Sequence, residues 1–391
     1  MSRKRALVLG SGVAGLTCAH LLAARGWHID CAAKPATAGP VVIISRSNAN
    51  LLLELWQADE RLFTGAHRLR GRVVQWEDTT APTQTVTPAF VVPVDVLLAR
   101  LAGRAEEAGI RFVASEQADA AGYDWVVHAG GRDAVPEKYI TFGRRRGVAV
   151  SVKLTPLAHT DRALIESVPG GWLFVIPQGL GRGALQAVFA DPVVDPRVQL
   201  RALLAESRSM SARIEEIVGE PAGFAAMPRL AMTPCVSRSI DVGDAAVALD
   251  PLSGNGVGSG LRSAILAAAV LDAAGREAMP EACFEHYAQR LRKTMRSHVQ
   301  SCVEFYGQAA HADGWRAEIG MMSEALHRLP AEPDAAAFML NDGRLERIPG
   351  AIVSDAIAAG VAPAAWDFRA NNRPRAASSS SDAACRYRGT P

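Results

Sequence analysis

The sequence predicts an α/β fold in which a doubly wound parallel sheet is interrupted by an antiparallel sheet and followed by a helical C-terminal region. Three observations predict it. An apolar strand runs directly into a glycine-rich turn near the N-terminus, short strand patterns separated by Gly/Pro turns fill residues 147–191, and helical patterns dominate residues 280–329. With 391 residues, 49% of them hydrophobic, the chain is long enough for two domains with their own cores.

The first unit of the chain has the pattern strand, glycine turn, helix, strand. Residues 6–10 form an all-apolar run, as expected for a parallel strand that is buried on both faces. A helix pattern follows over residues 16–25, and a second strand pattern over residues 28–33. The turn before the helix, Gly10-Ser-Gly-Val-Ala-Gly15, is the GxGxxG motif of Rossmann-like dinucleotide-binding domains.

Each glycine of this motif has its own physical role. Gly10 permits the tight turn, Gly12 lets a pyrophosphate approach the backbone, and Gly15 lets the helix pack closely on the strand. The backbone N–H groups at the helix start, around Val13 and Ala14, then face the phosphates. We therefore expect a dinucleotide cofactor at this turn.

The end of the second strand departs from the usual pattern. An acidic residue is expected there to bind the ribose hydroxyls, but Ala33 and then Lys34 occupy the position, and Asp30 comes too early. Loss of one such hydrogen bond costs about 1.5 to 3 kcal/mol, or roughly ten- to a hundredfold in affinity. We expect the cofactor to bind less tightly than in proteins with an acidic strand end.

The following segment adds further elements to the same half of the protein. The expected elements are a helix over residues 45–57, strands over 72–76 and 85–92, a helix over 94–108 and a strand over 110–114. A buried strand over residues 124–128 then leads to Ala129-Gly130-Gly131-Arg132. Since ligands of doubly wound sheets bind at the carboxyl ends of the strands, Gly130 is expected near the cofactor.

The middle of the chain changes character and then returns to the first pattern. Strands over 148–154, 172–176 and 184–189 predict an antiparallel sheet, followed by a helix over about 198–218. A buried strand over residues 245–249 is expected to rejoin the parallel sheet. The polar turn that follows it opens a long helix ending near Ala274.

These patterns predict a division of the chain into parts. The first domain comprises residues 1–70, 92–145 and 237–275, the inserted second domain 71–91 and 146–236, the helical region 276–368, and a disordered tail 369–391.

Composition excludes several classes of function. A net charge of +2 gives no reason to expect a nucleic-acid partner. Six cysteines without a Cys-x-x-Cys pair indicate neither a metal site nor a disulfide framework. No apolar stretch reaches the ~20 residues that span a bilayer, and no signal-like segment is present, so the sequence predicts a cytoplasmic protein without a membrane span.

The most specific signal lies near residue 250. The pair Gly243-Asp244, a short strand and the turn Asp250-Pro-Leu-Ser-Gly-Asn-Gly256 follow the N-terminal motif by about 230 residues. Together with the Gly130 segment between them, they resemble the flavoprotein monooxygenases that have a glutathione-reductase-type FAD domain. The resemblance covers roughly residues 5–275.

This resemblance implies that the protein binds FAD non-covalently. It places Asp244 at the ribityl or ribose chain, and the helix after the turn at the flavin pyrimidine ring. Backbone N–H groups at a helix start suit that place, because reduced flavin carries negative charge at N1 and C2=O. The implied cofactor-binding residues are Gly10, Gly12, Val13, Ala14, Gly15, Ala33, Lys34, Arg46, Arg100, Gly130, Asp244, Pro251, Gly254, Asn255, Gly256 and Val257.

The two arginines in this set have an alternative interpretation, in which they do not bind the cofactor. The family commonly has an arginine at the start of the helix that begins at Val94, whereas this chain has Arg100 about a turn and a half later. Arg46, just before an earlier helix, could take its place at the pyrophosphate or the flavin edge. Either arginine could instead be an ordinary surface or helix-capping residue.

Two narrower resemblances concern the substrate. The segment Gly171-Trp172-Leu-Phe-Val-Ile-Pro177 is similar to the Trp-x-Trp-x-Ile-Pro box of flavin-dependent halogenases, but the lysine that halogenases need is missing between Lys34 and Lys138. Extended to Val188 and combined with the turn near residue 250, it more closely resembles the maturation flavoenzymes that oxidise a tryptophan of a partner protein to a tryptophylquinone. Those enzymes serve quinohemoprotein amine dehydrogenases and related amino-acid oxidases.

The resemblance implies a monooxygenase reaction. NADH or NADPH would bind transiently and reduce FAD, O2 would form a C4a-hydroperoxyflavin, and one oxygen would pass to an electron-rich aromatic ring, here a tryptophan on a peptide or protein subunit. The sequence assigns no general base. The candidates for catalysis are Pro251, Trp172 and His159, and Trp172 could equally be a core residue.

Two other functions fit the same motifs. One is an FAD-dependent reductase or dehydrogenase of an apolar, isoprenoid-like substrate, because Asp-Pro-Leu-x-Gly turns occur in such enzymes. The other is a non-catalytic binding protein that keeps the fold but has lost FAD, an alternative that Ala33 raises.

Overall fold

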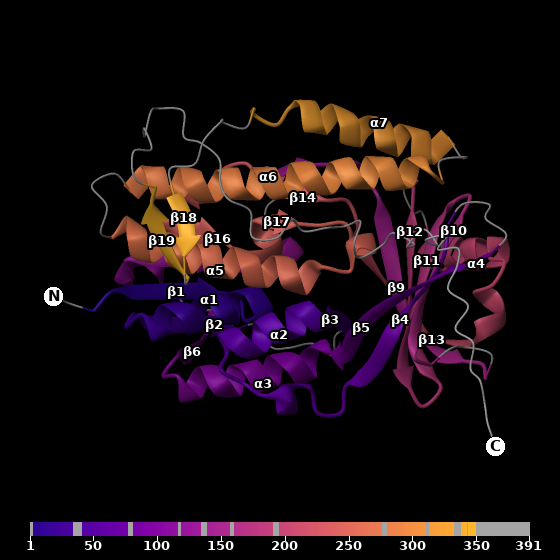
Figure 1. Ribbon diagram of the computed structural model, residues 1–391, viewed down its shortest axis with the longest axis horizontal. Coiled ribbons are helices and arrows are strands. Elements are labelled where there is room, and N and C mark those ends of the chain that lie inside the picture. The colour runs from indigo at the N-terminus through magenta and orange to yellow at the C-terminus, as the bar shows by residue number, and fades with distance from the viewer. Residues whose placement is uncertain are drawn as a thin grey trace, which may run out of the picture.

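The computed structural model describes residues 3–33, 41–76, 81–115, 119–133, 139–156, 160–190, 195–275, 280–309, 313–331, 338–341 and 343–348. It confirms the predicted α/β class (Figure 1). A largely parallel sheet with its helices and a larger, mostly antiparallel sheet stand beside each other, and two long C-terminal helices run across the top of the view.

The parallel sheet has the strand order β15-β16-β7-β1-β2-β6. Its strands are β1 (Arg5–Leu9), β2 (His28–Ala33), β6 (Arg111–Ala114), β7 (Trp125–His128), β15 (Cys235–Val236) and β16 (Ser239–Asp241). All neighbours pair in parallel except β15 and β16. The predicted strands at β1, β2, β6 and β7 are confirmed, because short apolar runs between glycine-containing turns are a strong local signal.

Helices α1 (Val13–Ala24), α3 (Val94–Glu107) and α5 (Gly256–Ala274) belong to this half of the protein. α1 packs against both α3 and α5. α5 is long and apolar enough to cross a membrane, but 67% of its apolar window is buried inside the protein. That burial is typical of a core helix.

The second sheet has eight strands in the order β13-β9-β12-β11-β10-β4-β5-β3. Its strands are β3 (Val41–Ser45), β4 (His67–Gln75), β5 (Thr83–Pro93), β9 (Arg146–Leu154), β10 (Arg162–Val168), β11 (Gly171–Gly179), β12 (Arg182–Phe189) and β13 (Ile214–Ala225). All pairs are antiparallel except β4 with β10. The sequence patterns did not predict β3 or β10, and β3 runs directly into helix α2 (Arg46–Leu55).

The helix predicted over residues 198–218 is wrong in its second half. Helix α4 covers only Pro196–Glu206, and β13 follows as an edge strand on β9. The buried carboxylate of Glu166, on β10, accepts hydrogen bonds from the backbone N–H groups of residues 208, 209 and 210. This distant carboxylate binds N–H groups that a continuing helix would use internally, so the chain turns away.

We expect Glu166→Gln to destabilise the protein by about 1.5 to 3 kcal/mol. The amide has one acceptor oxygen instead of two, and its NH2 group faces the backbone donors. Glu206→Gln is the matched control, because Glu206 is exposed and accepts a single N–H bond, from Gly170. Urea denaturation followed by circular dichroism measures both, and equal stabilities of the two variants would contradict the assigned role.

The return to the parallel sheet also differs from the prediction. β16, not residues 245–249, pairs with β7. After β16 the chain turns at Gly243, whose φ of +63° favours glycine, and β17 (Val247–Ala248) joins a separate sheet with β14 (Arg229–Ala231) and β8 (Tyr139–Thr141). An apolar run alone does not reveal which strand it pairs with.

The C-terminal part consists of α6 (Pro280–Gly307) and α7 (Asp313–His327), followed by a hairpin of β18 (Phe338–Asn341) and β19 (Arg344–Arg347). The helices are confirmed, and the hairpin lies in a region expected to be helical. The predicted tail 369–391 lies outside the described residues. The division into domains remains a prediction. β3 lies in residues 1–70, the first segment predicted for the first domain, but it pairs in the eight-stranded sheet.

Candidate functional site

The glycine turn after β1 is built by close packing. Gly10 has a φ of +122°, and a Cβ atom there would lie 2.4 Å from the carbonyl oxygen of Ala129, which follows β7. A Cβ atom on Gly15 would lie 2.1 Å from the carbonyl oxygen of Gly10. Both glycines are therefore required by the backbone itself, as the sequence pattern predicts.

Gly12 differs from these two glycines because it borders open space. It is the N-cap residue of α1. Among the described residues, no side chain caps this helix, and a Cβ atom on Gly12 would meet no atom within 4 Å. Gly130 and Gly131, at the carboxyl end of β7, also border open space. The start of α1 thus has uncapped N–H groups beside a cradle made of glycines, which is the arrangement that binds phosphate.

The Gly243-Asp244 pair packs directly against this first turn. A Cβ atom on Gly243 would lie 2.7 Å from the Cβ atom of Ala14, and the Gly243 N–H donates to Ser263 Oγ on α5 at 2.8 Å. Asp244 comes next, and its Oδ2 accepts from Arg132 Nε at 3.1 Å. The fold thus brings together the two motifs that lie about 230 residues apart in the sequence.

Arg132 fixes the position of the Asp244 carboxylate. Its other nitrogens donate to the backbone carbonyls of Ala225, Met227 and Leu249. The guanidinium therefore ties the end of β7 to the segment before the turn at residue 250. Asp244 remains one-third exposed, so its carboxylate can still reach a ligand.

The second glycine turn leads to the start of α5. Pro251–Ser253 form one 3-10 turn, Gly254 has a φ of +58°, and Asn255 is the N-cap residue of α5 without capping it through its side chain. The Asn255 Oδ1 instead accepts from Asn48 Nδ2, on α2, at 2.8 Å. In the part of the chain that the structure describes, a Cβ atom on the exposed Gly256 would meet no atom within 4 Å, so this second helix start also borders open space.

A buried arginine lies beside the same turn. A Cβ atom on Gly254 would lie 2.8 Å from Arg72 Nη2, on β4. Burial lowers the pKa of Arg72 to about 10, so the guanidinium remains charged at neutral pH. The eight-stranded sheet thus contributes a positive charge next to the turn.

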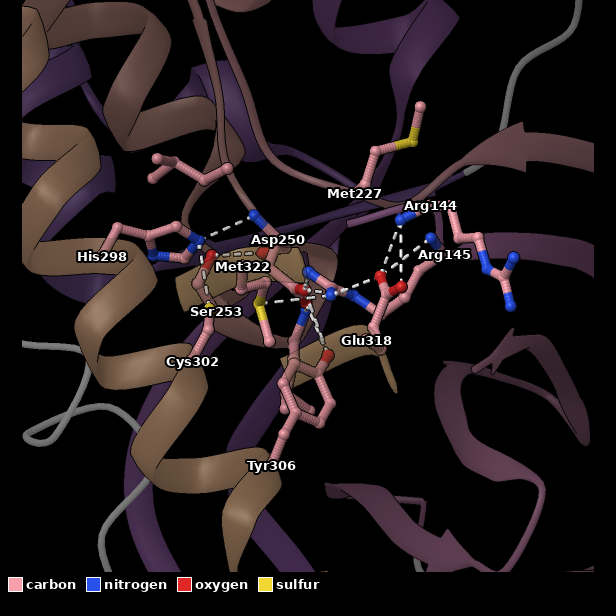
Figure 2. A network of polar contacts seen from close by, with 12 residues as sticks. Arg144, Arg145, Met227, Asp250, Ser253, His298, Cys302, Tyr306, Glu318 and Met322 are labelled. Carbon is pink, nitrogen blue, oxygen red and sulfur yellow. Dashed lines mark hydrogen bonds and ion pairs between the residues drawn. The ribbon is translucent and has the colours of Figure 1, made fainter. Parts of the chain in front are cut away.

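A network of buried polar side chains lies behind the turn (Figure 2). The Asp250 Oδ2 accepts from Arg145 Nη2 at 2.8 Å, and the Tyr306 hydroxyl donates to Asp250 Oδ1 at 3.0 Å. Arg145 Nη1 also donates to Glu318 Oε1 at 2.7 Å, and the Asp250 N–H donates to His298 Nε2 at 2.8 Å. All five side chains are buried.

The ionisation of this network follows from burial and charge. Burial lowers the pKa of Arg145, but the carboxylate of Asp250 and other neighbours more than offset this effect, so the net pKa is raised. Burial raises the pKa of Glu318, and Arg145 opposes the shift. Burial lowers the pKa of His298 to about 4, so His298 is neutral at pH 7, as its Nε2 atom requires to accept the Asp250 N–H.

Several candidates from the sequence occupy structural positions. Arg100 donates to the carbonyls of Leu62 and Thr64, and Arg46 forms an ion pair with Glu60 at 2.7 Å. Each therefore has a partner within the protein, as expected if the two arginines are ordinary surface or helix-capping residues.

The remaining candidates divide into three groups. Trp172 is fully buried and donates to Tyr306, which fits the core interpretation better than contact with a substrate. Pro251 lies in the second glycine turn, and Val257 lies in the first turn of helix α5. Lys34 and His159 lie outside the described residues, and the side chain of Ala33 is not among those described.

The sequence analysis missed the residues behind the turn. Arg145 belongs to a run of three basic residues, Arg144 to Arg146, and Asp250 opens the glycine turn, but neither pattern reveals that they pair. Tyr306 has no local signal at all. Among the described residues, no group of three or more His, Cys, Asp or Glu side chains could hold a metal ion.

No protein-family model and no curated protein matches the sequence. Solved structures do match. QhpG, a peptidyl tryptophan dihydroxylase essential for tryptophylquinone cofactor biogenesis, is 20% identical, with a TM-score of 0.69 over 89% of this chain and 86% of QhpG. The chain has the fold of flavin-dependent enzymes.

Two halogenases match the chain to a similar degree. The myxobacterial chondrochloren halogenase CndH is 18% identical, with a TM-score of 0.69 over 81% of this chain and 86% of CndH. The flavin-dependent halogenase CmlS is 19% identical, with a TM-score of 0.67 over 81% of this chain and 68% of CmlS. The fold is therefore common to enzymes that hydroxylate and enzymes that halogenate.

Proposed function

We propose that the protein binds FAD between the starts of α1 and α5. The observation that carries this proposal is that two uncapped helix starts border open space at Gly12 and Gly256, and that the two motifs pack together through Gly243 and Ala14. Helix starts stabilise the negative charges of a pyrophosphate and of a reduced flavin ring. The arrangement fits a dinucleotide whose phosphates lie at one helix and whose flavin lies at the other.

We infer that the chain's own residues divide the work of holding FAD. The N–H groups around Gly12, Val13 and Ala14 would hold the pyrophosphate, Asp244 would accept from a ribityl or ribose hydroxyl, and the Pro251–Val257 segment would bind the flavin ring. Bound FAD would supply the redox chemistry, taking electrons from NADH or NADPH and activating O2. The protein positions the flavin and excludes water from it.

We propose that the reaction is oxygenation of an electron-rich aromatic ring. The structural matches to a hydroxylase and to halogenases support this class, because all are flavin-dependent enzymes of the same fold. For the substrate we propose a tryptophan on a peptide or protein partner. The match to QhpG over 89% of the chain supports it, together with the sequence resemblance over residues 171–188.

Two of the five lysines, Lys4 and Lys153, give no support to halogenation. Lys4 lies next to the amino end of β1, at the opposite end of that strand from the glycine turn, with its ammonium group over the Trp27 ring. Lys153 pairs with Glu216 on the neighbouring strand β13. Neither ammonium group is placed to relay an oxidised halide to a substrate beside the turn at residue 250.

The decisive experiment combines purified enzyme, FAD, NADH or NADPH, O2 and a candidate amine-dehydrogenase subunit. Mass spectrometry of the tryptophan-containing peptide should show a gain of one or two oxygen atoms. Parallel reactions add chloride or bromide, omit O2, or replace the subunit with free aromatic acids or with an isoprenoid-like compound. Halogen incorporation, oxygen-independent reduction of an isoprenoid-like compound, or hydroxylation of free aromatic acids alone would each replace the proposal with a different activity.

We expect Asp244→Asn to weaken FAD binding about ten- to a hundredfold while the melting temperature of the apoprotein changes little. The amide is a poorer acceptor than the carboxylate, and a hydrogen bond to a charged group is worth about 1.5 to 3 kcal/mol. Fluorescence titration of apoprotein with FAD measures the affinity. Unchanged affinity would show that Asp244 does not contact the cofactor.

A further inference from the structure

Every polar atom of Asp250 is engaged within the protein. Its Oδ1 accepts from the Leu252 N–H at 2.9 Å and from the Tyr306 hydroxyl at 3.0 Å, and its Oδ2 accepts from Arg145 at 2.8 and 3.1 Å. Its N–H donates to His298, and its carbonyl accepts from the Ser253 hydroxyl at 2.8 Å. Asp250 therefore holds the middle and the last residue of the 3-10 turn that it opens (Figure 2).

The partners of Asp250 come from parts of the chain outside the first sheet. Arg145 directly precedes β9, and Tyr306 lies on α6. Figure 2 shows both side chains pointing toward Asp250. Glu318, on α7, accepts from the backbone N–H groups of residues 144 and 145 as well as from the Arg145 side chain. The second sheet and the C-terminal helices are thus joined to the residue that starts the second glycine turn.

The direction of the Tyr306 hydrogen bond is set by Trp172. A hydroxyl has only one proton to donate. The Trp172 indole N–H donates to the Tyr306 oxygen at 3.1 Å, so the Tyr306 proton points to the Asp250 carboxylate. Trp172 lies on β11, which extends the connection from the second sheet to the turn.

We propose that Tyr306 and Arg145 are positioning residues for the flavin, which they hold in place through Asp250 and the Pro251–Gly254 turn. The inference rests on the proposed binding of FAD at the start of α5. Gly254 and Asn255 alone separate this turn from α5, so a change in the turn also moves the first N–H groups of the helix. Neither residue needs to touch the cofactor for this effect.

The test compares two tyrosines in the same chemical arrangement. Tyr306 donates a hydrogen bond to Asp250, and Asp250 pairs with Arg145. In the same way, Tyr123 donates to Asp30, and Asp30 pairs with Arg111. Asp30 lies in the middle of β2, however, and is not part of either glycine turn. Tyr123→Phe is therefore the matched control for Tyr306→Phe.

FAD affinity and the visible spectrum of the bound flavin are measured for the wild type and both variants. We expect Tyr306→Phe to weaken binding about tenfold and to shift the flavin band, because one hydrogen bond to a charged carboxylate is lost. We expect Tyr123→Phe to change affinity by less than about twofold. Trp172→Phe provides a second variant, which keeps Tyr306 but removes the donor that orients it, and we expect about threefold weaker binding.

The outcomes separate this inference from the proposed function. If the wild type binds FAD and Tyr306→Phe matches Tyr123→Phe in affinity and spectrum, the positioning role is wrong and the cofactor proposal stands. Equal weakening in both variants also contradicts the inference, because it reports general loosening. A wild type that binds no FAD overturns both proposals. Melting temperatures of the apoproteins establish that each variant is folded.

Discussion

Gly12→Val is expected to abolish FAD binding in a protein that still folds, whereas Gly15→Val is expected to prevent stable folding. A Cβ atom on Gly12 meets no described residue within 4 Å, so a side chain there occupies the space proposed for the pyrophosphate. A Cβ atom on Gly15 would lie 2.1 Å from the Gly10 carbonyl oxygen, which belongs to the backbone and cannot rotate away.

The two effects differ in kind and are measured separately. We expect Gly12→Val to weaken FAD binding by more than about a hundredfold, or ~2.7 kcal/mol, with apoprotein stability nearly unchanged. We expect Gly15→Val to cost at least about 3 kcal/mol of stability, because the helix must move away from the strand. FAD titration and urea denaturation give the two quantities. A Gly12→Val protein with normal FAD affinity would show that the cofactor does not approach this turn.

Arg145→Met is expected to destabilise the protein by about 3 to 5 kcal/mol at neutral pH. Asp250 and Glu318 are both buried, and the variant removes the guanidinium that pairs with them. Buried carboxylates that lack their cation lower the free energy of unfolding by more than the intact ion pair raised it. The matched control is Arg146→Met, whose side chain is exposed and whose loss changes the net charge equally; its stability should change by less than about 0.5 kcal/mol.

The penalty is also expected to depend on pH. Burial already raises the pKa of Glu318 above its usual range, and removing Arg145 removes the charge that opposes this shift. The folded variant then binds a proton more strongly than the unfolded chain, so its stability rises as the pH falls through that raised pKa toward the ordinary pKa of a carboxyl group. Urea denaturation at about pH 5 and about pH 8 should therefore show a smaller difference from wild type at the lower pH. An equal penalty at both would show that Glu318 does not titrate in this way.

The position of Trp172 changes the interpretation of the strand that resembles the halogenase box. The sequence offered Trp172 both as a catalytic candidate and as a core residue, and its full burial with a hydrogen bond to Tyr306 supports the second. The same observation gives the residue a different importance, because Tyr306 leads to the turn proposed to bind flavin. The strand with this motif is thus connected to the turn through Tyr306.

The sequence by itself determined the parts of this protein that depend on neighbouring residues. The strand, turn and helix around Gly10 and Gly15 are local, and so is the turn from Asp250 to Gly256, because glycine spacing and apolar periodicity act over a few residues. From these local patterns, the α/β class and the place of the proposed cofactor could be predicted.

Only the tertiary structure decided what depends on residues far apart in the chain. Arg145 and Asp250 are 105 residues apart, and Asp250 and Tyr306 are 56 apart, so no local pattern indicates their contact. Likewise, residues 214–225 form a strand because the β9 edge is available and Glu166 ends the preceding helix. Strand pairing and buried ion pairs are formed between distant segments, so they depend on which partner the fold supplies and not on the local preferences from which helices and strands are predicted.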